Sequence, residues 1–237
     1  MNPPAKDLSK IASSDKVKKV QKDFEATHVR PERLMKTLFT DEAYVKANVD
    51  EARLMRRLFD LACNMQSHDT DMQLYSLFTD EECYDLWSCN NLYWYLTHAC
   101  SPVTDGLMPY READLLRNIL DRADAALKEG KNQATLRFGH ESCLLPLVAL
   151  LELNHYGESY PDVEKLSEQW RAYDIFPMAS NVQFVFFHKK GSNDVLVKVL
   201  LNEKEAKLPV KTDVAPYYHW KDVESYYREK LDKYQHI

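Results

Sequence analysis

The sequence predicts an α/β protein in which a long helical part precedes a smaller part that contains β-strands. No glycine occurs before Gly106, and apolar residues recur at spacings of three and four up to Lys128, which is typical of amphipathic helices. After Gly130 the pattern changes to short apolar runs rich in Val, Leu and Phe, which favour strands. We therefore expect a helical subdomain over residues 1–133 and an α/β part over residues 134–237.

Capping signals mark where several of the predicted helices begin and end. Acidic residues follow a threonine in Thr40–Glu42 and again in Thr79–Glu82, as at the capped start of a helix. Ser101–Pro109 contains proline, aspartate and glycine and is predicted to be a loop. Arg111–Leu127 is predicted to be an amphipathic helix that ends near Gly130.

The segment Asn90–His98, NNLYWYLTH, is densely aromatic. Such a segment could stack on nucleic-acid bases, or it could form the apolar face of a buried helix. No basic residue interleaves with the aromatic ones, and nucleic-acid binding needs basic residues nearby. We therefore favour the helix face.

Strand-like runs are concentrated in the last hundred residues of the sequence. Ala134–Phe138 is short and apolar enough for a buried strand. Val182–His188 and Val195–Leu201 are separated by a polar, glycine-containing loop and are predicted to form a hairpin. Ala206–Leu208 could add a short strand, and Trp220–Tyr234 is predicted to be a closing helix with its apolar residues near one face.

Composition excludes several classes of function. The net charge of −6 and the pI near 5.8 argue against nucleic acid as a partner, because that binding depends on clustered Lys and Arg. No apolar run of about eighteen residues is present, and the polar start MNPPAKDLSK lacks the apolar core of a signal peptide. We expect no membrane span and no export signal in this chain, and the sequence leaves its localisation open.

Cysteine and glycine spacing argues against metal and cofactor sites. The five cysteines form no C-x-x-C pair, so no zinc site is expected. Cys89 and Cys100 are spaced to share a helix face, which leaves one disulfide open, although reduced thiols are favoured. The five glycines form neither a dinucleotide-binding nor a P-loop pattern. No cofactor and no metal are expected.

The segment Gly139-His140-Glu141 contains the candidate catalytic residues of the sequence. It follows a predicted strand and precedes an apolar helix, and ligands of open α/β sheets gather at such strand ends. A second interpretation is purely structural, with Glu141 complementing the helix dipole and His140 filling a polar gap.

The twenty residues Ala134–Leu153, ATLRFGHESCLLPLVALLEL, resemble the second signature of the histidine phosphatases, in the branch with acid phosphatases, phytases and multiple inositol polyphosphate phosphatases. The resemblance extends to the preceding helix ADLLRNILDRADAAL and to the hairpin ending LVKVLLNEKEAKLP. The order of elements is similar to the carboxy-terminal portion of these enzymes. It implies an incomplete phosphoglycerate mutase-like α/β core with a large helical cap subdomain.

The resemblance also implies roles for individual residues. In the family, a histidine attacks phosphorus, a second histidine and several arginines hold the phosphoryl oxygens, and an acid protonates the leaving alcohol. Here His140 would bind phosphate, Glu141 would be the proton donor, and Arg137 would contact substrate. Burial beside the sheet would raise the pKa of Glu141. The alternative for Arg137 is a structural ion pair with an acid on a helix.

The first signature of the family, Arg-His-Gly-x-Arg-x-Pro, is absent from the sequence. The nearest string is Thr27–Pro31, which we interpret as the lead into a helix that starts near Pro31. No nucleophile is therefore assigned in this chain. Glu141 follows His140 directly, whereas relatives have Asp there or Glu one residue later.

Two functions remain open at this point. The first is a histidine-type phosphomonoester hydrolase, acting through a phosphohistidine on a phosphomonoester such as an inositol polyphosphate and lacking here the half with the nucleophile. The second is a catalytically inactive remnant or an anion-binding module of the same fold. The absent first strand would leave an open sheet edge, so we expect the missing amino-terminal half or self-association to cover it. Relatives are commonly secreted or periplasmic.

Overall fold

The contacts within the chain divide it into two compact units. The computed structural model describes residues 3–131 and 133–234. The larger unit holds the residues up to Val17 and those from Trp94 onward, and the smaller unit is Lys18–Tyr93. The predicted division between residues 133 and 134 follows the family's cap and core rather than these contacts, and it stays a prediction.

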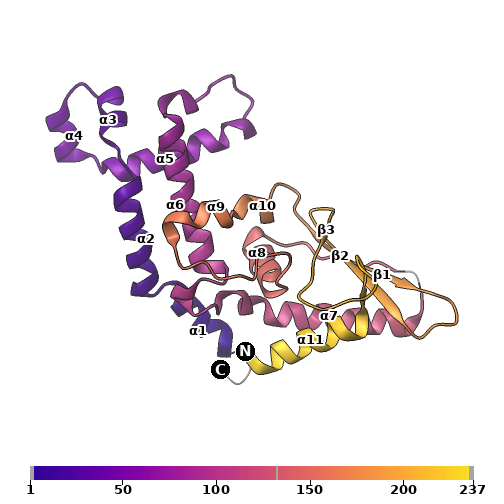
Figure 1. The fold of residues 1–237 in the computed structure, drawn as a ribbon. Coiled ribbons are helices and arrows are strands. Elements are labelled where there is room, and N and C mark those ends of the chain that lie inside the picture. Colours follow the sequence, from indigo (N-terminus) through magenta and orange to yellow (C-terminus); the bar gives the residue numbers. More distant parts are fainter. Residues whose placement is uncertain (1–2, 132, 235–237) are drawn as a thin grey trace. The chain divides into compact units, whose positions relative to one another are not determined.

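Helices supply most of the regular structure, and strands of the larger unit form one antiparallel sheet (Figure 1). The helices are α1 (Pro3–Ala12), α2 (Asp15–His28), α3 (Glu32–Leu38), α4 (Glu42–Asn48), α5 (Glu51–Asn64), α6 (Asp80–His98), α7 (Ala113–Glu129), α8 (Glu141–Leu150), α9 (Leu166–Gln169), α10 (Ala172–Ile175) and α11 (Trp220–Tyr234). The 3-10 helices are η1 (Met65–Ser67), η2 (Tyr75–Leu77), η3 (Pro102–Thr104), η4 (Met108–Glu112) and η5 (Val163–Lys165). The strands are β1 (Val182–His188), β2 (Val195–Leu201), β3 (Lys204–Ala206) and β4 (Tyr218–His219).

A reciprocal cap starts α6 in the smaller unit. The Glu82 backbone N–H donates to the Thr79 hydroxyl at 3.2 Å, and the Thr79 N–H donates to the Glu82 carboxylate at 2.9 Å. Arg33 on α3 donates to the same carboxylate through Nε at 2.7 Å and holds the pKa of Glu82 below its usual range. The helix start predicted at Thr79–Glu82 is confirmed.

The aromatic segment Asn90–His98 forms the second half of α6. Leu92, Tyr95 and Leu96 on this segment are fully buried. The segment is helical and buries Tyr95, as expected for a helix face in the core, whereas Tyr93 is 47% exposed.

The sheet of the larger unit is built on the predicted hairpin. β1 pairs antiparallel with β2, with Val182 opposite Leu201 and His188 opposite Val195. β3 and β4 both pair with β2 on its other side, so β1 lies at an edge of the sheet. The hairpin and the closing helix α11 are confirmed. The third strand occupies Lys204–Ala206, two residues earlier than the predicted Ala206–Leu208.

Polar contacts join α11 to α7 and α8. The Arg228 guanidinium binds Asp121 at 2.9 Å and Asp124 at 2.8 Å, both on α7. The Tyr227 hydroxyl donates to the Leu151 carbonyl at 2.7 Å, and Lys230 donates to the Leu150 carbonyl at 2.7 Å. These last two bonds satisfy carbonyl groups at the carboxyl end of α8, which would otherwise lack partners.

The predicted buried strand at Ala134–Phe138 is wrong. These residues are extended but form no strand, and all five are exposed, with Leu136 at 75% and Phe138 at 93% exposure. A strand requires a neighbouring strand to accept and donate its ladder hydrogen bonds, and no described segment pairs with this one.

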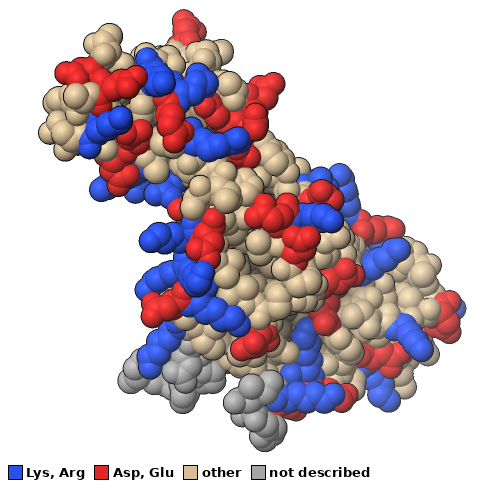
Figure 2. Space-filling view, turned by 60° about the vertical axis from the view of Figure 1, so that its left-hand side comes forward, with Lys and Arg blue, Asp and Glu red and all other residues tan. Residues whose placement is uncertain are grey.

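Acidic and basic side chains are intermixed on the surface. Lys and Arg alternate with Asp and Glu across the face that Figure 2 shows. Within residues 3–131 and 133–234, no helix is long and apolar enough to cross a membrane.

Candidate functional site

The candidate site lies at the amino-terminal end of α8. His140 is the N-cap residue, with φ −101° and ψ 163°, and its carbonyl accepts from the N–H groups of Cys143 and Leu144 at 3.0 and 3.1 Å. Glu141 is the first residue of the helix. The last six residues of α8, Leu145–Leu150, are buried and anchor the helix in the core. The buried apolar run thus fixes two polar side chains where the helix presents its positive end.

His140 and Glu141 are both exposed in this structure. The expected burial of Glu141 beside a sheet is therefore wrong. The physical reason is the extended segment before α8, which has no strand beside it among the described residues and leaves this end of α8 open to solvent.

Arg137 contacts a helix rather than the end of α8. Its guanidinium donates to the Asn118 side-chain oxygen on α7 at 2.8 Å. This contact resembles the structural alternative, although the partner is an amide and not an acid. A role in substrate binding stays a prediction.

A polar cluster from η4 and α6 lies around the first turn of α8, and sequence analysis missed it. Burial raises the pKa of Glu112, which hydrogen-bonds the thiol of Cys143. The pKa of His98 is lowered to about 4, mainly by burial and also by the charge of Arg111, while the charge of Glu141 acts in the opposite direction. The only sequence signal was the presence of polar residues beside a predicted loop. Such residues are common, so pattern alone does not select them.

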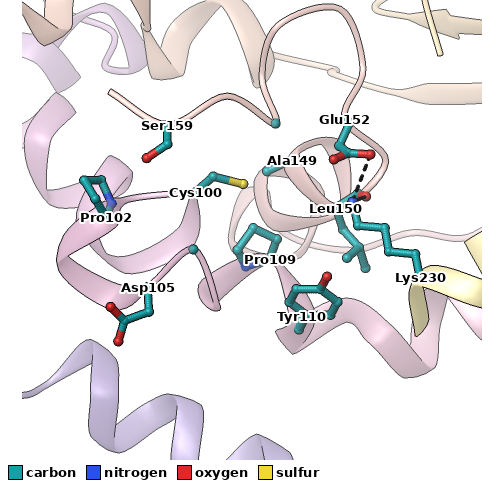
Figure 3. A pocket seen from close by; sticks show the side chains of 12 residues that line it. Cys100, Pro102, Asp105, Pro109, Tyr110, Ala149, Leu150, Glu152, Ser159 and Lys230 are labelled. Atoms are coloured by element: carbon teal, nitrogen blue, oxygen red, sulfur yellow. Dashed lines mark hydrogen bonds and ion pairs between the residues drawn. The ribbon is translucent and has the colours of Figure 1, made fainter. Parts of the chain in front are cut away.

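A cavity of about 580 Å³ lies at the other end of α8, away from His140 and Glu141 (Figure 3). Cys100, Asp105 and Ser159 lie along one side of it, and Lys230 and Glu152 lie along the other. Lys230 and Glu152 form an ion pair at 3.1 Å. We place the candidate chemistry at the amino-terminal end of α8, because the cavity's one lysine is already neutralised by its glutamate partner.

The string Thr27–Pro31 has a structural role in the smaller unit. His28 is the last residue of α2, stacks on Phe24 with ring centroids 3.8 Å apart, and has Nδ1 2.9 Å from the Phe24 carbonyl. Arg30 binds Glu81 at 2.8 Å. The chain then enters α3, as predicted for this string.

The described residues offer no ready metal site. No group of three or more His, Cys, Asp or Glu side chains in residues 3–131 and 133–234 is arranged to hold a metal ion. All five cysteines are free thiols, so the disulfide left open for Cys89 and Cys100 is not formed. Burial raises the pKa of Cys89 to about 12 and of Cys100 to about 11, which keeps both thiols protonated at neutral pH.

Comparison with known proteins places this chain in a family. A family model of the histidine phosphatase superfamily (branch 2) matches residues 2–202. The human multiple inositol polyphosphate phosphatase 1 is 28% identical over 134 residues, which are 51% of this chain and 27% of that protein.

Solved structures of the multiple inositol polyphosphate phosphatase of Bifidobacterium longum have the same fold. The complex with phosphate matches with a TM-score of 0.79 at 18% identity, covering 96% of this chain and 58% of the other. The complex with inositol hexasulfate matches with a TM-score of 0.76 at 18% identity, covering 94% and 56%. This chain therefore has an α/β histidine phosphatase-like fold with a helical region, and spans less than two thirds of these relatives. The chain belongs to branch 2 of the histidine phosphatase superfamily.

Proposed function

We propose that this chain supplies the phosphate-binding residue and the proton donor in the active site of a phosphomonoesterase that acts on inositol polyphosphates. The proposal rests on the adjacent positions of His140 and Glu141 at the start of α8, in a chain of this family. The substrate class follows from the relatives, which are inositol polyphosphate phosphatases by name.

The geometry suits the charges that phosphoryl transfer creates. The positive end of α8 and the imidazole N–H of His140 stabilise negative charge that develops on the phosphoryl oxygens. Glu141, one residue along, gives its proton to the alcohol oxygen as the bond from that oxygen to phosphorus breaks. Proton donation of this kind contributes roughly 10²–10⁴ in rate.

The nucleophile comes from a polypeptide part outside these 237 residues, because no Arg-His-Gly-x-Arg-x-Pro string is present. In the first step the nucleophilic imidazole bonds to phosphorus and the alcohol leaves with the proton of Glu141. In the second step, water attacks the phosphohistidine, Glu141 takes a proton from that water, and inorganic phosphate leaves. The histidine is regenerated, so atoms and protons balance over the cycle.

Complementation tests the proposal. The chain is mixed with the part of the Bifidobacterium longum phosphatase that the structural match leaves uncovered, and phosphate release from phytate is measured. Glu141→Gln should lower the rate by at least about 10², since Gln cannot donate a proton in this way. Glu42→Gln, which changes an exposed acid in the first turn of α4, is the matched control and should retain full rate. Activity of the chain alone would refute the assignment of the nucleophile to another part.

An inactive anion-binding module is the second candidate, favoured by the absence of the first signature. It predicts that the isolated chain binds inositol hexasulfate, that His140→Gln weakens this binding, and that the complemented mixture releases no phosphate. Calorimetric titration with inositol hexasulfate, run beside the phosphate assay, separates the two candidates.

A further inference from the structure

His219 in the larger unit lies between two aspartates that come from separate loops. Its Nδ1 is 3.0 Å from the nearer carboxylate oxygen of Asp194, and its Nε2 is 3.0 Å from a carboxylate oxygen of Asp213. Asp194 ends the loop between β1 and β2, and Asp213 belongs to the segment between β3 and β4. The imidazole on β4 therefore joins two loops of the sheet to each other.

The number of hydrogen-bond donors on His219 decides when both contacts can form. An ionised aspartate side chain only accepts hydrogen bonds, so each carboxylate needs an N–H group of the imidazole. A neutral imidazole has one N–H group, and a protonated imidazole has two. Both contacts therefore form together only when His219 is protonated. Deprotonation leaves a nitrogen lone pair facing one of the carboxylates.

The two carboxylates also stabilise the protonated imidazole. Hydrogen bonds to Asp194 and, second, to Asp213 raise the pKa of His219. The same contact holds the pKa of Asp213 below its usual range, so this side chain stays ionised at neutral pH. The charges and the donor count thus favour the same protonation state.

Charged residues of the elements packed against β4 do not replace these contacts. Lys198 of β2 is 3.1 Å from Glu205, and Lys221 and Asp222 at the start of α11 are exposed and carry opposite charges. Among the described residues, the two aspartates are the hydrogen-bond partners of the His219 imidazole. Its titration is therefore controlled mainly by them.

The segment of residues 209–217 depends on this contact for its attachment. In the described part of the chain, residues 209–216 make hydrogen bonds outside the segment only through Asp213. The bonds that Thr212 forms with Val214 and Tyr217 stay inside the segment. No residue from 209 to 217 is buried, so little apolar packing holds the segment in place.

Asp194 is the better fixed of the two aspartates. Its backbone N–H donates to the Ser192 hydroxyl at 3.0 Å, and the next residue begins β2. Both of its carboxylate oxygens lie within 3.1 Å of Nδ1 of His219. The Asp213 side chain, in contrast, is 83% exposed. The one N–H of a neutral His219 therefore stays on Asp194, and the contact with Asp213 is lost.

We propose that His219 is a pH-dependent switch, in which the protonated imidazole holds residues 209–217 on the sheet and deprotonation releases them. An unfolded histidine has a pKa of about 6.5, and the pKa of folded His219 is raised above its usual value. The contact is therefore complete below about pH 6.5 and is lost as the pH rises through the pKa of the folded state.

An NMR titration of the His219 ring signals tests the arrangement. Wild-type His219 should titrate at a higher pH than it does in Asp194→Asn or in Asp213→Asn, because each substitution removes a negative charge beside the imidazole. The signals of His155, which is exposed, are the internal control, and neither substitution should alter them. Titration of His219 at the same pH in all three chains would overturn the proposal.

Trypsin cleavage after Lys211 measures release of the segment, because cleavage of a transiently open segment follows the population of the open form. The rate is divided by that of an unstructured peptide with the same bond, which removes the pH dependence of trypsin. This ratio should rise at least about twofold from about pH 6 to about pH 8.5, as expected for an exposed ion pair. His219→Gln should give the higher ratio at both pH values, and the matched control His155→Gln should respond like wild type.

Asp213→Asn keeps the test decisive if His219→Gln does not fold, because the Asp213 side chain is exposed and removing its charge leaves the rest of the sheet intact. This variant should raise the cleavage ratio at about pH 6 by at least about twofold and reduce its pH response. A wild-type ratio that is equal at the two pH values would overturn the proposal. A full wild-type pH response in His219→Gln or Asp213→Asn would also overturn it.

Discussion

Acidification should destabilise the larger unit through His98. This side chain is only 6% exposed, and burial lowers its pKa to about 4, with Arg111 adding to the effect and Glu141 opposing it. An unfolded histidine has a pKa of about 6.5. Between pH 6.5 and about pH 4, His98 binds a proton in the unfolded chain but stays neutral in the folded chain. The free energy of unfolding therefore decreases as the pH falls through this window.

The magnitude follows from linkage with these two pKa values. The loss relative to a chain with neutral His98 is about 0.2 kcal/mol at pH 7, about 2 kcal/mol at pH 5 and about 3 kcal/mol at pH 4. His98→Gln keeps a polar side chain of similar length beside the Thr97 hydroxyl, which lies 2.7 Å from Nδ1 of His98. The variant should therefore lose about 2 kcal/mol less than wild type between pH 7 and pH 5.

Urea unfolding followed by tryptophan fluorescence measures this difference. Three of the four tryptophans, Trp94, Trp170 and Trp220, lie in the same unit as His98. His188→Gln, which removes an exposed imidazole at the end of β1, should behave as wild type. The reasoning is refuted if the wild-type and His98→Gln chains lose equal stability on acidification, or if an NMR titration of His98 gives a pKa near 6.5.

Two further substitutions test local packing. Thr79→Ala removes one half of the reciprocal cap with Glu82 and should lower the free energy of unfolding by about 1 kcal/mol, measured by urea unfolding against a Thr37→Ala control on the exposed face of α3. Gly157→Ala would bring a Cβ atom within 2.9 Å of the Glu152 Cα and should cost about 1–3 kcal/mol by the same measurement. An unchanged midpoint for Gly157→Ala would show that the backbone at Glu152 moves aside.

Local patterns predicted the elements whose partners lie within this chain. The hairpin of β1 and β2, the cap at Thr79 and the helix α11 are set by alternation, capping and periodicity, and each finds its partner nearby. Ala134–Phe138 has the same strand-like composition, yet it is not a strand here. Its pattern is correct for a buried strand, but pairing depends on a neighbour, which no local pattern can supply.

The candidate site was likewise predicted only in part. A glycine, a histidine and a glutamate before an apolar run suffice to place His140 and Glu141 at the start of α8. The approach of Arg111 and Glu112 to that helix depends on how η4 packs against it. No periodic pattern in the sequence predicts this packing. The exposure of Glu141 depends on the uncovered segment, which the sequence-based expectation assumed to be paired.

The division into units sets an order for folding during synthesis. The smaller unit is one uninterrupted stretch, Lys18–Tyr93, so all of its contacts are available once that stretch has left the ribosome. The larger unit draws residues from both ends of the chain, and its α7 and α8 are held by Tyr227, Arg228 and Lys230 of α11. The carboxyl end of α8 therefore gains these two hydrogen bonds only after Trp220–Tyr234 has been made.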